Sequence, residues 1–438
     1  MKTSTGADKA LEYFNEHTLK RLLDRRSEPE WMVQFREEAL ALFRMLPWPT
    51  TNDEEWRRTH IDHIDFNAFQ LLDEAVTATE PKAVADPRWA GQIRFRGYQT
   101  VEASVNPELL QKGVLFTSLA DALNRQPELI REYFMTRNVR PADGKFEALH
   151  GAFWTHGVVL YVPPQVEIEL PFLAVFEEPA QQNVTMPHVL IVLDRGARAT
   201  LLTEAYSTGD GRSLRNAVVN VFLGDNADIR FTELQNLNEQ TFNFMNGWSE
   251  IQRDARFYSL LANFGSELTK NRFGGGIVGA GASAELHGVY FAHRHQHFDQ
   301  RTIQYHQAPA ATSNVLYKGV VKDKAHTIYQ GLIRVFKHAQ KTDAYQSNKN
   351  LSLNDGARAD SIPSLEIETN DVRCTHGATV GKVSEEEIFY LMSRGLSRLD
   401  AKKLLVAGFL DEVILQAPES VQTILHDWLE KKLETLEN

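Results

Sequence analysis

The chain has 438 residues, 42% of them hydrophobic and 24% charged, which is a normal composition for a folded protein of two or three structural parts. Its 47 basic and 58 acidic residues give a net charge of −11, which disfavours binding to nucleic acid or to an anionic membrane. One cysteine excludes an intramolecular disulfide, no apolar run reaches the ~20 residues that span a bilayer, and the N-terminus lacks a secretory signal, so we expect a cytoplasmic protein.

Residues 7–46 are predicted to form two helices, because their apolar residues recur at helical spacing. Ser27 as the cap, Pro29 in the first turn and Glu30 three residues after the cap predict that the second helix begins there. Leu46-Pro47 should end it, because proline disfavours helix for the preceding residue.

The following residues up to 154 are less regular. Residues 50–100 give no clear pattern of either helix or strand. Helices are expected at 119–124 and 128–134, before a turn at 141–144. We take 1–154 as an N-terminal helical region with a linker.

From 155 to 383 the pattern changes to short alternating runs that predict strands, as at 158–162, 189–193 and 218–223. A junction recurs in which apolar residues lead into Gly or Asp and then Ala. Its alanines are 30, 28, 27, 43 and 32 residues apart: Ala197, Ala227, Ala255, Ala282, Ala325 and Ala357. A strand-containing repeat of this length predicts a parallel β-helix, with an irregular coil or an extra partial turn in the 43-residue gap. A β-sandwich is the alternative.

Residues 384–438 should form a small C-terminal helical domain. Ser384 with Glu387 predicts a capped helix start, and Gly395 is suited to the left-handed conformation at its end. Further helices are expected from Ala401 to Val413 and from Val421 to Leu433. Because about 55 residues cannot bury this apolar surface alone, we expect the domain to dock on another surface.

The strongest candidate site is Cys374 with His376, since the chain has no other thiol. In a strand the two side chains share a face, about 7 Å apart at the backbone. A thiolate and an imidazole are common metal ligands, and an imidazolium would favour ionisation of the thiol. An iron-sulfur cluster usually has four protein ligands, so a chain with one thiol would have to share it with another chain. The alternative is an inert buried cysteine beside a hydrogen-bonded histidine.

Two other groups of residues carry weaker signals. Gly274–Gly279 has the glycine spacing of a dinucleotide-binding motif, but alternation in 284–291 predicts a strand where that motif needs a helix, so we interpret these glycines as β-helix corners. No P-loop sequence occurs, and we expect this chain to bind no nucleotide. His287, His293, His295, His297 and His306 are either a metal site or structural hydrogen-bonding groups, and the second is favoured.

The run from Leu365 through Asp371-Val372-Arg373-Cys374-Thr375-His376-Gly377 to Gly395 resembles the SufB/SufD family of iron-sulfur cluster assembly proteins, and within it the SufD branch. Gln296-His297-Phe298-Asp299 and Glu55-Trp56-Arg57-Arg58-Thr59 resemble the middle and the N-terminal region of the same family. The resemblance implies a right-handed parallel β-helix flanked by helical domains.

It also implies a non-catalytic scaffold subunit of the SufBCD complex. Such a subunit pairs with its paralogue SufB, binds the ABC-type ATPase SufC through its C-terminal helices, and contributes to a transient cluster at the SufB–SufD interface. Cys374 and His376 fall on the family's cluster-assembly positions, and the isolated chain is a possible homodimer. The runner-up is a β-helix enzyme acting on carbohydrate, a common activity on that fold.

Overall fold

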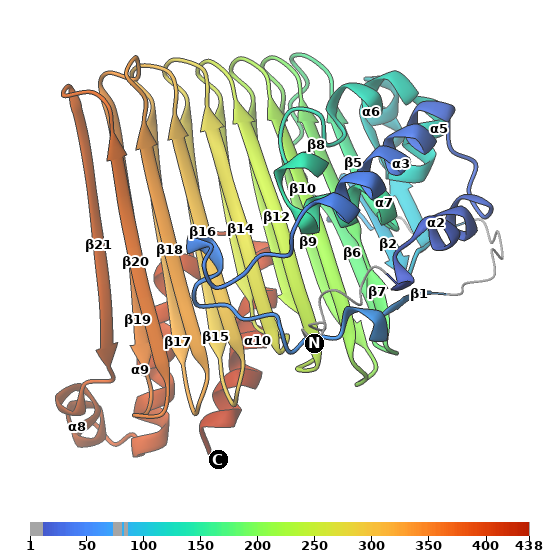
Figure 1. Ribbon diagram of the computed structural model, residues 1–438. Helices are drawn as coiled ribbons and strands as arrows, with labels where there is room; N and C mark the ends of the chain where they lie inside the picture. The colour runs from blue at the N-terminus through green and yellow to red at the C-terminus, as the bar shows by residue number, and fades with distance from the viewer. Residues whose placement is uncertain (1–11, 73–80, 83–85, 438) are drawn as a thin grey trace.

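The computed structural model describes residues 12–72, 81–82 and 86–437, most of which wind into a parallel β-solenoid of about eight turns (Figure 1). Two long sheets form its sides. Sheet A contains β1 (Gln70–Leu71), β4 (Leu115–Ser118), β5 (His156–Val162), β7 (Asn183–Thr185), β8 (Pro187–Leu193), β10 (Ser213–Leu223), β12 (Thr241–Ile251), β14 (Leu268–Ile277), β16 (His297–His306), β18 (His326–Val335) and β20 (Arg358–Ile367). Sheet B contains β2 (Gly91–Arg96), β3 (Gln99–Val105), β6 (Phe172–Pro179), β9 (Arg198–Thr208), β11 (Asp228–Asn236), β13 (Arg256–Asn263), β15 (Ser283–Ala292), β17 (Thr312–Val321), β19 (Thr342–Ser352) and β21 (Val372–Lys382).

Consecutive strands from β8 to β21 alternate between the two sheets, so each pair of strands completes one coil. Each strand pairs in parallel with the strand two places later, as β10 does with β12 from Ser213↔Thr241 to Leu223↔Ile251. This arrangement confirms the predicted parallel β-helix. The alternative sandwich is wrong, because its sheets would be antiparallel.

The corners after the sheet A strands stack on one another through backbone hydrogen bonds. In the corners after β8, β10 and β12 one residue has a left-handed conformation, with φ 69° at Gly196, 58° at Asn226 and 57° at Asp254. The backbone N–H of each donates to a carbonyl in the next coil, Gly196 to Asp225 and Asn226 to Arg253, both at 2.8 Å. The alanine that follows is fully buried at Ala197, Ala227, Ala255 and Ala282. The recurring junction is therefore the corner of the solenoid.

The predicted irregular coil between Ala282 and Ala325 is wrong. Strands β14 to β19 pair in full register there, and the next corner alanine after Ala282 is Ala311. It was missed because Ala310 itself has φ 56°, in a turn without Gly or Asp. Ala325 and Ala357 lie at the opposite corners, after the sheet B strands β17 and β19. The recurring alanines therefore mark corners after sheet A strands up to Ala282, and corners after sheet B strands from Ala325 on.

The prediction that the glycines at 274–276 form a corner is also wrong, since they lie inside β14. A Cβ on Gly274 would lie 2.8 Å from the backbone oxygen of Ile303, and one on Gly279, which does lie in a turn, would lie 1.9 Å from the backbone nitrogen of Arg253. These glycines permit close packing of neighbouring coils.

The N-terminal elements cover one end of the solenoid and part of the outer face of sheet A (Figure 1). Their helices are α2 (Glu16–Leu23), α3 (Glu30–Met45), α4 (Pro107–Gln111), α5 (Leu119–Arg125), α6 (Pro127–Tyr133) and α7 (Lys145–Phe153), with short 3-10 turns at Glu54–Trp56, Phe66–Ala68 and Pro141–Asp143. The predicted helices at 119–124 and 128–134 and the end of α3 at Leu46 are confirmed, whereas α7 was not predicted.

The cap predicted at Ser27 is wrong. Helix α3 begins after Pro29, which makes no side-chain cap. The neighbouring Glu28 carboxylate is occupied by a buried ion pair with Arg36, at 2.7 Å. Tertiary packing thus replaces the local cap.

Residues 46–70 form a strap that crosses the outer face of sheet A (Figure 1). A buried network holds it, in which Thr59 Oγ1 donates to the Asp299 carboxylate at 2.5 Å and Lys270 Nζ donates to the same carboxylate at 2.6 Å. Lys270 also donates to the backbone carbonyl of Glu55.

Asp299→Ala should lower the free energy of unfolding by about 3 kcal/mol, because it leaves Lys270 buried without its counter-ion. Chemical denaturation measures this change. Glu366→Ala is the control, since it removes a partner of the exposed Arg334 and should cost less than about 1 kcal/mol. Equal changes in the two variants would contradict this role of Asp299.

Two buried histidines join α7 to sheet A. The His150 Nδ1–H donates to the carbonyl of Asn216 at 2.9 Å, and His150 Nε2 lies 3.1 Å from His188 Nδ1. Burial lowers the pKa of His150 to about 3, and burial also lowers the pKa of His188 well below its usual value. Both are therefore neutral in the folded state.

The protein should lose stability as the pH falls below ~6.5, where these histidines take up protons in the unfolded state but not in the folded state. At pH 5 the His150 contribution alone should be about 2 kcal/mol smaller than at pH 8. Denaturant titrations at the two pH values measure the difference, and His150→Asn should reduce it. Equal stability of the wild-type protein at pH 5 and pH 8 would contradict the prediction.

The C-terminal helices α8 (Glu385–Ser393), α9 (Arg398–Ile414) and α10 (Glu419–Glu434) follow β21. The Ser384 cap, the left-handed Gly395 and the predicted helices are confirmed. Helices α9 and α10 dock on the outer face of sheet B, where Val406, Leu410 and Leu425 join a core cluster with Leu260 and Phe291. The expected docking of this small domain on another surface is thus confirmed, and that surface is sheet B of the same chain. No helix in the described part of the chain is long and apolar enough to cross a membrane.

Candidate functional site

Cys374 and His376 lie on β21, the terminal strand of sheet B. Within the described residues this strand pairs with β19 alone, with Cys374 opposite Ala344 and His376 opposite Gln346. Ala344 and Gln346 are both buried and belong to the side of β19 that faces the solenoid interior. The thiol and the imidazole therefore lie on the same side of sheet B as Ala344 and Gln346, one strand nearer to the open end of the solenoid.

The two side chains differ in exposure. Cys374 is half-buried against a small apolar cluster that includes Ile333, Val335 and Ala344. His376 is exposed, and no residue of the described chain donates or accepts a hydrogen bond to its imidazole. The imidazole is thus available to a ligand from outside the chain.

The thiol is not activated in the isolated chain. Burial raises the pKa of Cys374 above its usual value, and the carboxylate of Asp343 raises it further. The sequence predicted that a neighbouring imidazolium would lower the pKa of this thiol, but no imidazolium is among the causes of the shift. The thiol is protonated at neutral pH, and a metal would have to displace that proton in order to bind.

The end of the solenoid that carries this pair is uncovered. β20 and β21 are the last strands of their sheets, 10 and 11 residues long, and their outer edges have no partner strand in the described chain. Ile367 and Val380 are exposed there, by 43% and 50%. In Figure 1 the edge of β21 forms one end of the molecule. Long unpaired edges with exposed apolar residues are surfaces for pairing with another chain.

The described residues contain no group of three or more His, Cys, Asp or Glu side chains that could hold a metal ion. Cys374 and His376 therefore supply two ligands and need others. Glu366 and Glu368, on and just after β20, pair with Arg334 at 3.6 and 3.0 Å and remain exposed.

The histidine-rich segment does not converge on one site. His293 and His295 lie in the corner between β15 and β16, so 293, 295 and 297 do not share a strand face. His293 contacts Glu239 at 2.9 Å, His297 contacts Thr59 at 3.1 Å, and His306 contacts Ser313 at 2.7 Å. The alternative of a metal site is not supported in the described part of the chain, and these three histidines have the structural role that was favoured.

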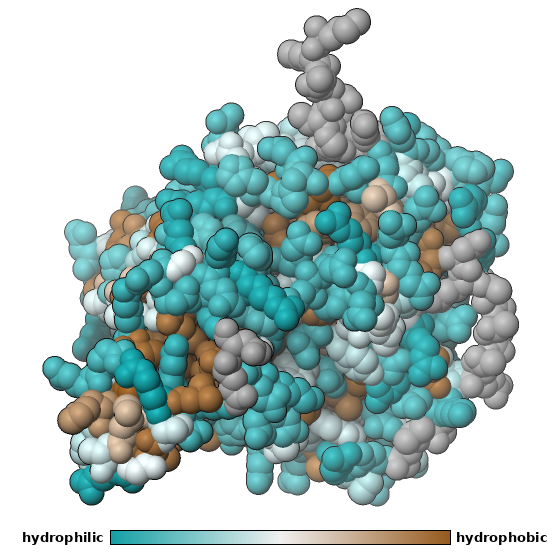
Figure 2. All heavy atoms as spheres, turned by 90° about the horizontal axis from the view of Figure 1, so that it is seen from below, coloured by the Kyte–Doolittle hydropathy of each residue, from teal (hydrophilic) through white to brown (hydrophobic). Residues whose placement is uncertain are grey.

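A second candidate surface is the apolar side of α8 and the beginning of α9. Only Ile388 of α8 is buried. Phe389 and Tyr390 are exposed by 73% and 56%, and three further exposed residues complete what we call the α8 patch: Met392, Leu396 and Leu404. Figure 2 shows apolar side chains gathered at the end of the molecule that carries these helices. The sequence contained the signal, since Ile388 to Met392 is an unbroken apolar run on a helix that has one buried position.

Comparison with known proteins gives matches over most of the chain. Residues 176–409 match the SufBD core domain of SUF system FeS cluster assembly, and residues 95–173 match the SufBD protein N-terminal region. The Bacillus subtilis iron-sulfur cluster assembly protein SufD is 30% identical over 431 residues, covering 96% of this chain and 98% of the relative. A Staphylococcus haemolyticus iron-sulfur cluster assembly SufBD family protein is 28% identical and covers 92% of this chain and 89% of the relative. These matches confirm the resemblance that rested on residues 55–59, 296–299 and 365–395.

Proposed function

This chain belongs to the SufB/SufD family of the SUF iron-sulfur cluster assembly system, and from that premise we propose that it is a non-catalytic scaffold subunit that builds a transient cluster jointly with SufB. The observation that carries the proposal is the position of Cys374 and His376 on the terminal strand of an uncovered solenoid end. Family membership supports this function over the carbohydrate-active enzyme.

The cluster is shared because this chain cannot supply a full ligand set. An iron-sulfur cluster usually takes four protein ligands, and the pair provides one thiol and one imidazole. A second solenoid pairing with the edges of β20 or β21 would bring its own ligands next to His376. SufB, as the paralogue in the same family, is the proposed second solenoid.

The ATPase of the complex is a separate chain, because this sequence has no P-loop. We assign the α8 patch to the contact with SufC. An exposed apolar patch on a short helix that projects beyond the solenoid is typical of a protein interface. Helices α9 and α10 hold that patch in place by their own docking on sheet B.

Affinity purification of the tagged chain from its own cells tests the proposal. We expect a β-solenoid paralogue and an ABC-type ATPase to be recovered with it. Recovery of neither protein, together with hydrolysis of pectin or a similar glycan by the purified chain, would contradict the scaffold function.

Charge at the solenoid end should abolish pairing with SufB. The double variant Ile367→Lys with Val380→Lys places two cations on strands that must contact the partner. This should weaken the free energy of association by several kcal/mol. Co-purification and light scattering measure the association. Met45→Lys is the control, since Met45 is 78% exposed on α3, away from this end. Unchanged pairing in the double variant would show that the interface lies elsewhere.

A further inference from the structure

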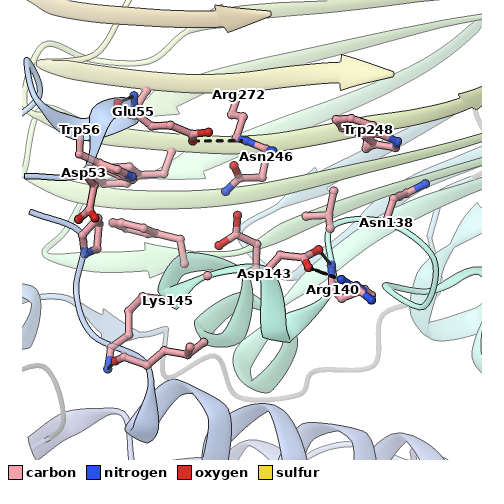
Figure 3. A pocket seen from close by; sticks show the side chains of 18 of the residues that line it. Asp53, Glu55, Trp56, Asn138, Arg140, Asp143, Lys145, Asn246, Trp248 and Arg272 are labelled. Atoms are coloured by element: carbon pink, nitrogen blue, oxygen red, sulfur yellow. Dashed lines mark hydrogen bonds and ion pairs between the residues drawn. The ribbon is translucent and has the colours of Figure 1, made fainter. Parts of the chain in front are cut away.

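A large cavity lies between the N-terminal elements and the outer face of sheet A (Figure 3), and no residue of β20 or β21 lines it. Its volume is about 890 Å³, which is the size of a small-molecule site. The strap and the start of α7 form one wall, and β12, β14 and β16 form the other. Six aromatic side chains line it: Trp48, Trp56, Phe146, Phe244, Trp248 and Tyr305.

The cationic side chains around this cavity are already engaged. Three arginines each pair with a carboxylate: Arg272 with Glu55 at 3.5 Å, Arg137 with Glu250 at 3.5 Å, and Arg140 with Asp143 at 2.8 Å. Two of these pairs are drawn as dashed lines in Figure 3. Lys270 pairs with Asp299 at 2.6 Å, and Lys145 Nζ donates to the backbone carbonyl of Leu46 at 2.8 Å.

Three carboxyl groups that line the cavity, Asp53, Glu54 and Glu147, form no ion pair in the described chain, and of these only Glu147 is half-buried. It lies in the first turn of α7, and no basic side chain in the described chain forms an ion pair with it. Burial raises the pKa of Glu147, and the carboxylates of Asp143 and Glu55 raise it further against the opposing effect of Arg272. The cavity therefore contains a half-buried carboxyl group whose charged form a bound cation would stabilise.

The aromatic walls already hold cations against their faces. Lys270 Nζ lies 4.9 Å from the ring centre of Trp56, and the Arg272 guanidinium lies 5.9 Å from that of Trp248. Electron-rich rings attract positive charge in this geometry, most strongly when water is excluded. The same walls would favour a cationic ligand over an anionic one.

We propose that this cavity binds a small organic ammonium ion, with Glu147 as its counter-ion and the aromatic side chains that line the cavity, Trp248 among them, as its walls. The site is separate from Cys374 and His376, and its existence does not depend on the proposed assembly of a cluster. A carboxylate together with an aromatic cage is a common way to recognise alkylammonium groups.

Calorimetric titration of the full chain with 2-phenylethylamine tests the proposal, with 3-phenylpropionate as an anionic probe of similar size and spermidine as an aliphatic amine. We expect the wild-type protein to bind 2-phenylethylamine and not 3-phenylpropionate. Tighter binding of spermidine would assign the site to aliphatic amines. Absence of binding by both amines, or equal binding of the amine and the anion, would overturn the proposal.

Glu147→Gln should weaken amine binding by at least tenfold, and Trp248→Ala by several-fold. Glu128→Gln is the matched control, since Glu128 is an exposed carboxylate in the first turn of α6 and does not line the cavity. Circular dichroism confirms that each variant is folded. Wild-type affinity in the folded Glu147→Gln variant would also overturn the proposal.

Discussion

Replacing Phe389 and Tyr390 together by Ala should weaken binding of the SufC ATPase by more than a hundredfold. Both side chains are largely exposed, and aromatic residues at the centre of an interface cost about 2 kcal/mol or more each when truncated. The fold should be unaffected, because neither side chain belongs to the core clusters of the chain. Surface plasmon resonance with purified SufC measures the loss.

Leu415→Ala is the control for this experiment. Leu415 is 60% exposed, at the C-terminal end of the 17-residue α9, about 16 Å along the helix from Leu404, the nearest patch residue on α9. It should bind SufC like the wild-type chain. If Leu415→Ala weakens binding and the double variant does not, the contact lies on the far side of the C-terminal domain.

Deletion of residues 384–438 is a poorer test of the SufC contact than the Phe389 and Tyr390 double variant. It would remove α9 and α10, which cover Leu260, Phe291 and other apolar side chains of sheet B. We expect the truncated chain to lose stability and to aggregate, so a loss of ATPase binding would not identify the contact.

Replacing His376 by Ala in the SufBCD complex should lower cluster content about tenfold or more after anaerobic reconstitution. The imidazole is exposed and unpaired in the described chain, so its removal takes away a ligand or proton acceptor and no core volume. Loss of groups that only support metal ligands already costs 10–100-fold, and loss of a ligand should cost at least as much. Iron and sulfide content and the visible absorption spectrum measure the effect.

Cys374→Ala should have the smaller effect of the two, because the protonated, half-buried thiol assists the imidazole. His338→Ala is the control, since His338 is an exposed histidine in the turn between β18 and β19. All three variants should assemble with SufB and SufC. Normal cluster content in an assembled His376→Ala complex would contradict this role. It would show that Cys374 is an inert cysteine and that His376 takes no part in cluster assembly.

Much of the solenoid was predictable because its corners impose a local rule. Four successive corners, from Ala197 to Ala282, combine a left-handed residue with a buried alanine, as Asn226 with Ala227 and Asp254 with Ala255 do. The prediction failed at Ala310, where coil stacking holds an alanine in the left-handed conformation that Gly, Asn or Asp would mark. Tertiary contacts had replaced the local signal there, as the Glu28–Arg36 ion pair did at the start of α3.

The candidate site was predictable to a smaller extent. Strand alternation was sufficient to place Cys374 and His376 on one face. The sequence could not show that this strand is the last of its sheet, or that burial and Asp343 raise the pKa of the thiol. Those properties depend on residues brought together by the fold. The cavity at Glu147 was missed for the same reason, since its walls come from segments about 100 residues apart.

The central proposal is that Cys374 and His376 are ligands of a cluster shared with SufB. Anomalous X-ray diffraction at the iron edge, from crystals of the anaerobically reconstituted SufBCD complex, tests it most directly. We predict an iron peak at the interface between the two solenoids, within coordination distance of the His376 imidazole and next to Cys374 Sγ. An iron peak bound only by residues of SufB, away from β21, would contradict it.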